Sequence, residues 1–164
     1  MASSGWKTYL YATDFHDNRI DVFDASFKPA TLSGNFTDPG LPARFAPFGI
    51  QAFGNQLYVT YAMQDDAAHD DVRGFGNGFV DVFTSSGQMV RRLITRGALD
   101  SPWGLAIAPS GFGSLSHALL VGNFGDGIVN AYDQPQGASA EHCLGRAGSR
   151  CGTTGCGACA SATA

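Results

Sequence analysis

The chain has 164 residues, a formal net charge of −4 and 15% charged residues. It is long enough to bury the core of one domain, but it offers no basic surface for nucleic acid or an anionic membrane, and no stretch approaches the length of a membrane span. We therefore expect no nucleic-acid partner and no membrane span. The 22 glycines and 12% aromatic residues favour short strands joined by tight turns, and hence an all-β fold.

The N-terminal part of the chain predicts a short extension followed by a β-hairpin. Residues 1–7 are interpreted as the extension, and they lack the apolar run that an export signal requires. The segment from Lys7 to Asp14 alternates apolar with small or polar residues, and Arg19 to Asp24 does the same after a polar turn. This hairpin, whose repeated strands begin at Leu10 and Ile20, recurs twice. The second copy has strands that begin at Leu57 and Val80, and the third has strands that begin at Leu119 and Val129.

Two further strands complete each unit. An opening strand with a Pro-aromatic-Gly-aliphatic pattern precedes the second and third hairpins, at Pro47 to Phe53 and Pro102 to Ala108. An outer strand is expected at Met89 to Thr95, and a weaker one at Thr31 to Thr37. Four strands per unit are typical of a propeller blade, so residues 8–133 predict an incomplete β-propeller of two to three blades.

The middle copy of the hairpin carries an insertion. Leu10 to Ile20 and Leu119 to Val129 each span 10 positions, whereas Leu57 to Val80 spans 23, so the middle loop has 13 additional residues. Carboxylates and a histidine crowd this loop, and they predict a metal site, with Ca²⁺ as the possible ion, formed by Asp65, Asp66, His69, Asp70 and Asp71. The alternative is that Arg73 neutralises these carboxylates.

Loops that join the second and third strands of successive blades emerge on one face. This face therefore collects further polar candidates for ligand binding, namely Asp14, His16, Asp17, Asn18, Asn123 and Asp126. The alternative is that these side chains only hydrogen-bond to the backbone of their own turns. Phe48 and Trp103 occupy equivalent repeat positions and could stack on a ligand, but we favour a place in the core for both.

Residues 134–164 form a Gly/Ala/Cys-rich tail without apolar periodicity, which predicts disorder or a frameshift product. Back-translation of residues 155–164 in another frame permits Leu-Trp-Gly-Leu, a further opening strand, which favours the frameshift. In the printed frame, Cys151, Cys156 and Cys159 with His142 have zinc-like spacing. A frameshift would make that spacing accidental.

Residues 8–133 resemble bacterial NHL-like β-propeller proteins of uncharacterised function, some of which carry a PEP-CTERM sorting signal. The motifs that carry the resemblance are Tyr11 to Phe15, Phe45 to Gln51, Tyr58 to Ala62, Gln64 to Val72, Gly76 to Phe83, Ser101 to Ala106 and Val121 to Gly127. The resemblance implies an extracellular or periplasmic protein with a longer, closed propeller of about six blades.

The resemblance also implies a function in binding. The expected role is that of a binding or scaffold module that recognises a polar ligand or a protein partner through the loop face. One alternative, by analogy with other six-bladed propellers, is a calcium-dependent, lactonase-like hydrolase. Another alternative is a non-functional truncated fragment, whose open blade edges would drive self-association.

Overall fold

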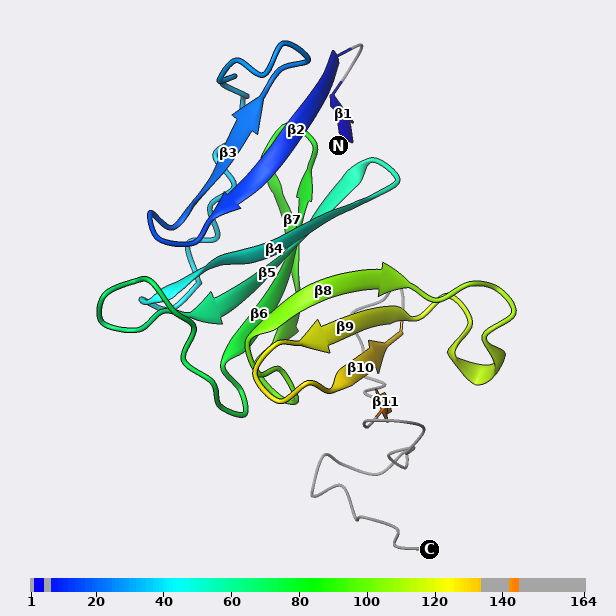
Figure 1. The fold of residues 1–164 in the computed structure, drawn as a ribbon. Helices are drawn as coiled ribbons and strands as arrows, with labels where there is room; N and C mark the ends of the chain where they lie inside the picture. The colour runs from blue at the N-terminus through cyan, green and yellow to red at the C-terminus, as the bar shows by residue number, and fades with distance from the viewer. Residues whose placement is uncertain (1, 5–6, 134–141, 145–164) are drawn as a thin grey trace, which may run out of the picture.

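The computed structural model describes residues 2–4, 7–133 and 142–144 of the chain. These residues form three antiparallel sheets, and their only helix is the short 3-10 helix η1 (Gly113–Leu115). Figure 1 shows the sheet of β4 to β7 between the other two. The predicted all-β class is confirmed. Within the described residues, no helix has the length and apolar character needed to cross a membrane.

The first sheet has the order β1-β2-β3. Its strands are β1 (Ala2–Ser4), β2 (Lys7–Asp14) and β3 (Arg19–Phe23). The predicted hairpin is confirmed, since Leu10 pairs with Phe23 and Asp14 with Arg19. β1 pairs with the start of β2, so part of the expected N-terminal extension belongs to the sheet.

The outer strand expected at Thr31 to Thr37 is wrong, because residues 31–37, all of them described, form no strand. Instead, the N–H groups of Gly34 and Phe36 donate to the carbonyls of Ser86 and Gly87, in the turn of the middle sheet. Phe36 is buried against Tyr11 and Phe83, with ring centroids 5.8 and 5.6 Å apart. The burial of this ring between two sheets therefore outweighs the local strand preference.

The other two sheets each have four strands in sequence order. The middle sheet contains β4 (Phe45–Phe53), β5 (Gln56–Met63), β6 (Gly78–Thr84) and β7 (Met89–Thr95). The third sheet contains β8 (Pro102–Ile107), β9 (Leu119–Asn123), β10 (Val129–Tyr132) and β11 (His142–Leu144). β11 therefore lies inside the segment expected to be an irregular tail.

The register of the strands confirms the repeat. In the three central hairpins, Ile20 pairs with Thr13, Val80 with Thr60 and Val129 with Gly122. In every copy, the second residue of the pair lies three positions after the leucine that begins the copy. The two opening strands are also equivalent: the register shifts between Pro47 and Gly49 in β4, and between Pro102 and Gly104 in β8. Phe48 and Trp103 are thus the extra residues of equivalent bulges.

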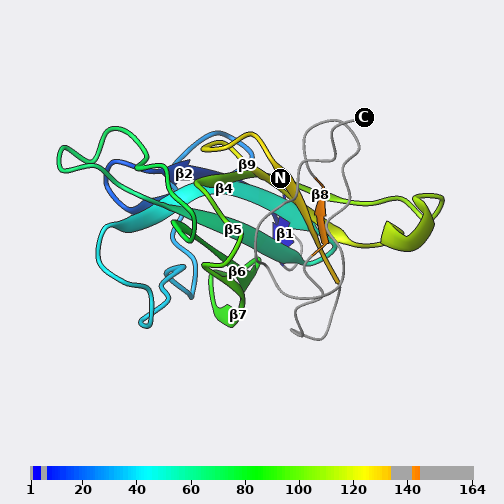
Figure 2. The ribbon, with the colours of Figure 1, turned by 90° about the horizontal axis from the view of Figure 1, so that it is seen from below.

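The core lies on both faces of the middle sheet. On the side of the first sheet, Leu57, Phe79 and Phe83 pack with Tyr11. On the side of the third sheet, Tyr58, Val80 and Val82 pack with Leu119 and Val121. This arrangement explains why the strand from Gly78 to Thr84 is buried at nearly every position. Figure 2 shows the sheets from below.

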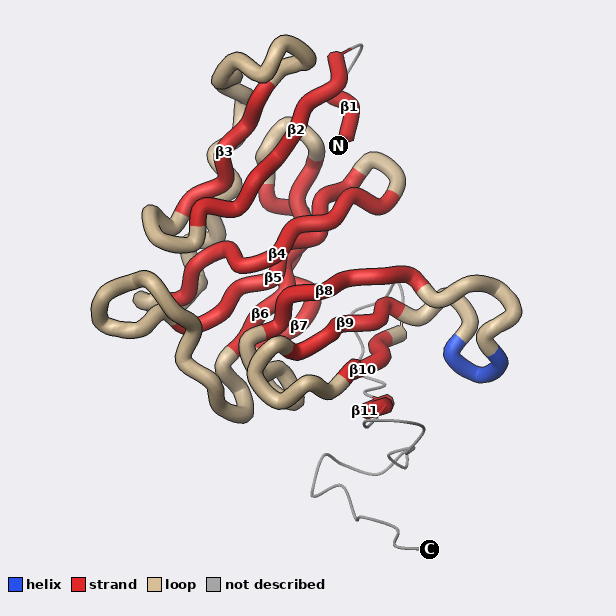
Figure 3. The backbone as a smooth tube through the Cα atoms, in the orientation of Figure 1, coloured by secondary structure: helices blue, strands red, loops and turns tan. Residues whose placement is uncertain are grey.

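The loops divide between two ends of the molecule. The β2–β3 turn (15–18), the long β5–β6 loop (64–77) and the β9–β10 turn (124–128) emerge on the left in Figure 1. The β8–β9 connection, which contains η1, lies at the opposite end (Figure 3). The predicted insertion is therefore present as the long β5–β6 loop, and the three loops share one face, which we call the loop face.

Candidate functional site

The long β5–β6 loop contacts the β2–β3 turn of the first sheet. Its His69 ring lies 4.9 Å from the ring of His16 in the β2–β3 turn. Nδ1 of His16 lies 3.1 Å from the carbonyl oxygen of Ala68. Gln64 Nε2 donates to the carbonyls of Phe15 and His16, at 2.5 and 3.2 Å. The two loops thus form one connected surface.

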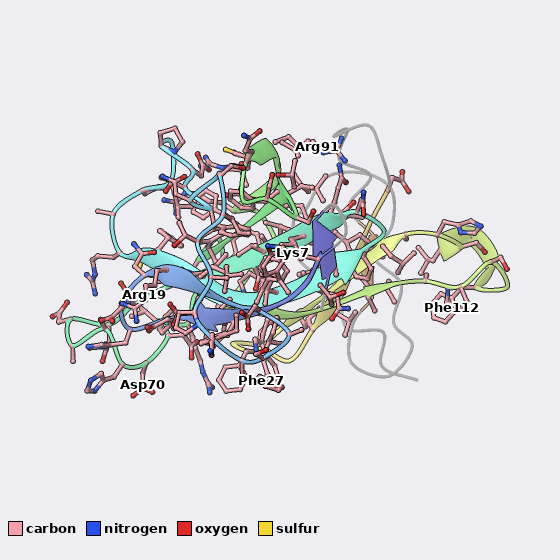
Figure 4. All side chains as sticks on the ribbon, turned by 90° about the horizontal axis from the view of Figure 1, so that it is seen from above. Lys7, Arg19, Phe27, Asp70, Arg91 and Phe112 are labelled. Atoms are coloured by element: carbon pink, nitrogen blue, oxygen red, sulfur yellow. The ribbon has the colours of Figure 1, made fainter. Side chains whose placement is uncertain are left out.

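Asp100 connects the same loop to the third sheet. Its carboxylate accepts a hydrogen bond from Gly74 N at 2.7 Å, and its carbonyl accepts one from Gly125 N at 3.1 Å. The Arg73 guanidinium lies over the Phe124 ring, 5.7 Å from its centroid. All three sheets therefore contribute to the loop face. In Figure 4, Arg19 and Asp70 lie at this end and Phe112 lies at the other.

Four aromatic rings form a continuous row across the loop face. The centroids are 5.0 Å apart between Phe15 and Phe48, 6.0 Å between Phe48 and Phe124, and 6.4 Å between Phe124 and Trp103. We call these four residues the aromatic row. Phe48 is half-buried, whereas Phe124 is 51% and Trp103 is 59% exposed. Exposed rings in contact with one another are uncommon on a protein surface that has no partner.

The expectation that Phe48 and Trp103 both lie in the core is wrong for Trp103. Each ring belongs to the extra residue of a bulge, and a bulge turns a side chain away from the regular alternation of its strand. The rings therefore reach the loop face. The Pro-aromatic-Gly pattern was visible in the sequence, but the bulge that redirects the aromatic residue was not.

The structure does not assemble the predicted metal ligands. Among the described residues, no group of three or more His, Cys, Asp or Glu side chains is placed to hold a metal ion. Asp65 accepts a hydrogen bond from the backbone N–H of His69 at 2.9 Å, which lowers the pKa of its carboxyl group. Asp66 forms an ion pair with Arg44 at 2.9 Å.

The other predicted members of that site also lack a shared centre. Asp70 accepts a backbone hydrogen bond from Asp65, and Asp71 forms an isolated bridge with Gln64. Arg73, expected to neutralise the carboxylates, instead lies over Phe124. Calcium binding by this loop, and the hydrolase that would depend on it, therefore stay predictions that the geometry does not favour.

The polar candidates of the first turn are engaged with one another. Asp14 accepts a hydrogen bond from Asp17 N at 3.0 Å. Arg19 forms ion pairs with Asp14 at 2.7 Å, Asp17 at 2.6 Å and Asp21 at 2.9 Å. Asn18 has a φ of 51°, in the left-handed region that asparagine tolerates in turns. These contacts match the alternative in which the side chains serve the turn.

The polar candidates of the third copy also make local contacts. Asn123 is 6% exposed and donates from Nδ2 to the carbonyl of Ala98 at 2.8 Å. Asp126 accepts a hydrogen bond from Ile128 N at 2.9 Å. The cysteines Cys151, Cys156 and Cys159 and the side chain of His142 lie outside the described part of the chain, so the zinc spacing is not tested.

A buried acidic pair was not predicted from the sequence. Asp81 in β6 is 0% exposed, and its Oδ1 lies 3.4 Å from Nε of Arg92. Asp38, from the β3–β4 connection, pairs with the same guanidinium. Asp81 occupies the repeat position of the more accessible Asp21. Both residues lie between two apolar residues, so the local sequence carried no signal that Asp81 is buried.

The two carboxyl groups of this pair have opposite pKa shifts. Burial, followed by the charge of Asp38, raises the pKa of Asp81 to about 7. Burial also acts to raise the pKa of Asp38, but hydrogen bonds from Gly40 and Arg92 outweigh it, and the net pKa is lowered. A protonated Asp81 can donate to an ionised Asp38, so one proton and one arginine satisfy both carboxyl groups. The same burial raises the pKa of Tyr61.

Comparison with known proteins reveals relatives but no function. No family model and no solved structure matches the chain. It is similar to three uncharacterized proteins of Acanthamoeba polyphaga mimivirus. R648 is 36% identical over 76% of this chain and 32% of its own length. R640 is 35% identical over 81% of this chain and 26% of its own length. L690 is 36% identical over 76% of this chain and 34% of its own length.

The lengths and sources of these relatives limit what they imply. The chain spans about a third or less of their length. They are viral, whereas the family that the motifs resemble is bacterial and exported, so bacterial origin and export gain no support and stay predictions.

Proposed function

We propose that the three sheets are consecutive blades of an incomplete NHL-like β-propeller, and that its loop face is a binding surface for a protein partner. The strand order, the common register of the hairpins and the equivalent bulges of β4 and β8 support the propeller. The opening strands are also close neighbours, since a Cβ added to Gly49 would lie 2.2 Å from the carbonyl oxygen of Trp103. Adjacent opening strands are expected around the axis of a propeller.

The aromatic row carries the proposal of binding. Interface residues with the largest binding energies are enriched in Trp, Tyr and Arg, and they cluster in well-packed patches. Here Trp103 and Phe124 are exposed, and Arg73 lies over Phe124 without forming an ion pair to any described residue. The rings come from three sheets, so the fold fixes their positions. A partner would therefore meet a largely preformed surface.

A selection from a random 12-residue peptide library tests this function. The full chain is immobilised, and enriched peptides are then compared on Trp103→Ala and on the control Val90→Ala, which alters another exposed side chain, 46% accessible, on β7. We expect enriched peptides to lose at least about tenfold in affinity on Trp103→Ala, a loss typical of a central contact, and to keep it on Val90→Ala. Failure to enrich any peptide, or equal binding to both variants, would refute the proposal.

A further inference from the structure

The outer face of the third sheet is the counterpart of two faces that are covered inside the molecule. In the first sheet, Tyr11 and Ile20 pack against the middle sheet. In the middle sheet, the equivalent Tyr58 and Val80 pack against the third sheet. The repeat register places Leu120 and Val129 at the same two positions of the third sheet. The first two sheets therefore present the same positions toward the sheet that follows, and the third sheet presents them on its outer face.

The exposed fractions differ on the outer face of the third sheet, against which the described residues place no further sheet. Tyr11 is 7% and Tyr58 is 4% exposed, and Val80 is fully buried. By contrast, Val129 is 40% exposed, although it occupies the position of Val80. Ala131 on the same face is 1% exposed and packs with Leu120, so the uncovered part of the face lies around Val129. An uncovered valine at a repeated packing position indicates that a partner layer belongs there.

The two opening-strand glycines give an independent comparison. Gly49 has no room for a side chain, since its added Cβ would lie 2.2 Å from the carbonyl oxygen of Trp103 in the next sheet. Gly104 occupies the same repeat position in β8, yet nothing lies within 4 Å of its added Cβ. The close approach that explains a glycine at position 49 thus has no counterpart at position 104.

The aromatic row ends in the same way. Phe15 and Phe124 are equivalent, because each lies five residues after the leucine that begins its hairpin. Phe15 packs on Phe48, an aromatic residue from the opening strand of the next sheet, at 5.0 Å. Phe124 contacts Phe48 and Trp103 but meets no ring from a later sheet among the described residues, and it remains 51% exposed.

We infer that the outer face of the third sheet is the docking surface for a fourth sheet of the same repeat. Its opening strand would carry the Pro-aromatic-Gly pattern, with the aromatic ring on Phe124 and a backbone carbonyl at Gly104. This inference rests on the proposed propeller. A second copy of the chain fits less well. The face of the middle sheet that packs on the sheet before it presents Phe79, Tyr61 and the buried Asp81. At the equivalent positions, the first sheet of a second copy would present the ion-paired Arg19, Asp14 and Asp21.

A covalent extension tests the docking surface. The full chain is extended at its C-terminus by a second copy of residues 38–95, which supplies a complete sheet with its opening strand. We expect the thermal midpoint to rise by about 5 °C or more, as burial of this face would produce in a domain of this size. Gly104→Val in the extended chain should abolish the rise, because the side chain fills the space of the incoming carbonyl. The matched control is Gly111→Val, whose Cβ also meets nothing within 4 Å but which lies outside the sheet.

Each outcome decides the question. An unchanged midpoint, or a rise that survives Gly104→Val, would overturn the docking surface. If sedimentation shows that the unextended chain is a dimer, and Gly104→Val makes it a monomer, the occupant is a second copy and the fourth sheet is wrong. Peptide selection on the loop face does not depend on this experiment, so a failure here would be distinguishable from a failure of the proposed function.

Discussion

Replacement of the buried Asp81 by asparagine is expected to make the protein less sensitive to pH. Asp81 is fully buried beside Asp38 and Arg92. Burial raises its pKa from the ordinary 3.8 of an aspartic acid to about 7. In the natural protein, Asp81 can donate a hydrogen bond to Asp38 only when its carboxyl group is protonated. The amide introduced by Asp81→Asn can donate at any pH.

The sign and size of the effect follow from proton linkage. Because the pKa is higher in the folded state than in the unfolded chain, the stabilisation is complete below pH 4 and is lost as the pH rises through about 7. A pKa shift of one unit corresponds to about 1.4 kcal/mol. Between pH 5 and pH 8, protonation of Asp81 therefore contributes on the order of 2–3 kcal/mol that the natural chain loses.

Urea unfolding at pH 5 and pH 8 measures this difference. We expect Asp81→Asn to reduce the fall in unfolding free energy between the two pH values by most of that amount. Asn130, which is 2% exposed and occupies the equivalent position of the third sheet, provides the mirror experiment: Asn130→Asp should increase the fall. If the difference between pH 5 and pH 8 is the same in Asp81→Asn and the natural chain, the reasoning about the buried acidic pair is refuted.

Three further predictions concern packing and metal binding. Gly49→Ala should lower the unfolding free energy by about 1–3 kcal/mol, as overpacking does, whereas Gly104→Ala should change it little, since its Cβ meets nothing within 4 Å; equal effects in urea would contradict the close approach of β4 and β8. Phe36→Ala should cost about 3–5 kcal/mol and speed proteolysis within residues 24–44, because this ring anchors the connection; an unchanged digestion pattern would contradict that role. Millimolar calcium should leave the thermal midpoint unchanged, since the described part of the chain assembles no group of three ligands; a saturable rise would restore the calcium prediction.

The sequence was sufficient to predict the repeat because its signals are local. Alternation predicted the hairpins, and the spacing from Leu57 to Val80 predicted the long loop. The segment from Thr31 to Thr37 failed for a tertiary reason: Phe36 is buried between two sheets, and its N–H donates to the middle sheet rather than to β3. Such a preference cannot be derived from a pattern within one segment.

The position of the loop face was predicted correctly, but the side chains that form its connected surface were not. The topology correctly brought the β2–β3 turn to the insertion, as the contact of His16 with His69 shows. The predicted site consisted of acidic residues, whereas the connected surface on this face is formed by the aromatic row. The equivalent repeat positions of Phe48 and Trp103 favoured a place in the core for both, and only the bulge reveals that Trp103 points outward. In the same way, Asp81 had the sequence context of Asp21, and only the packing of sheets distinguishes them.

A double-mutant cycle between Phe48 and Phe124 tests the central claim most directly. These rings belong to different sheets, with centroids 6.0 Å apart, and their contact holds the aromatic row together. Unfolding free energies of Phe48→Ala, Phe124→Ala and the double variant give the coupling. We expect a favourable coupling of about 0.5–1.5 kcal/mol, the range for an aromatic pair. Strictly additive effects would contradict a loop face built from packed sheets.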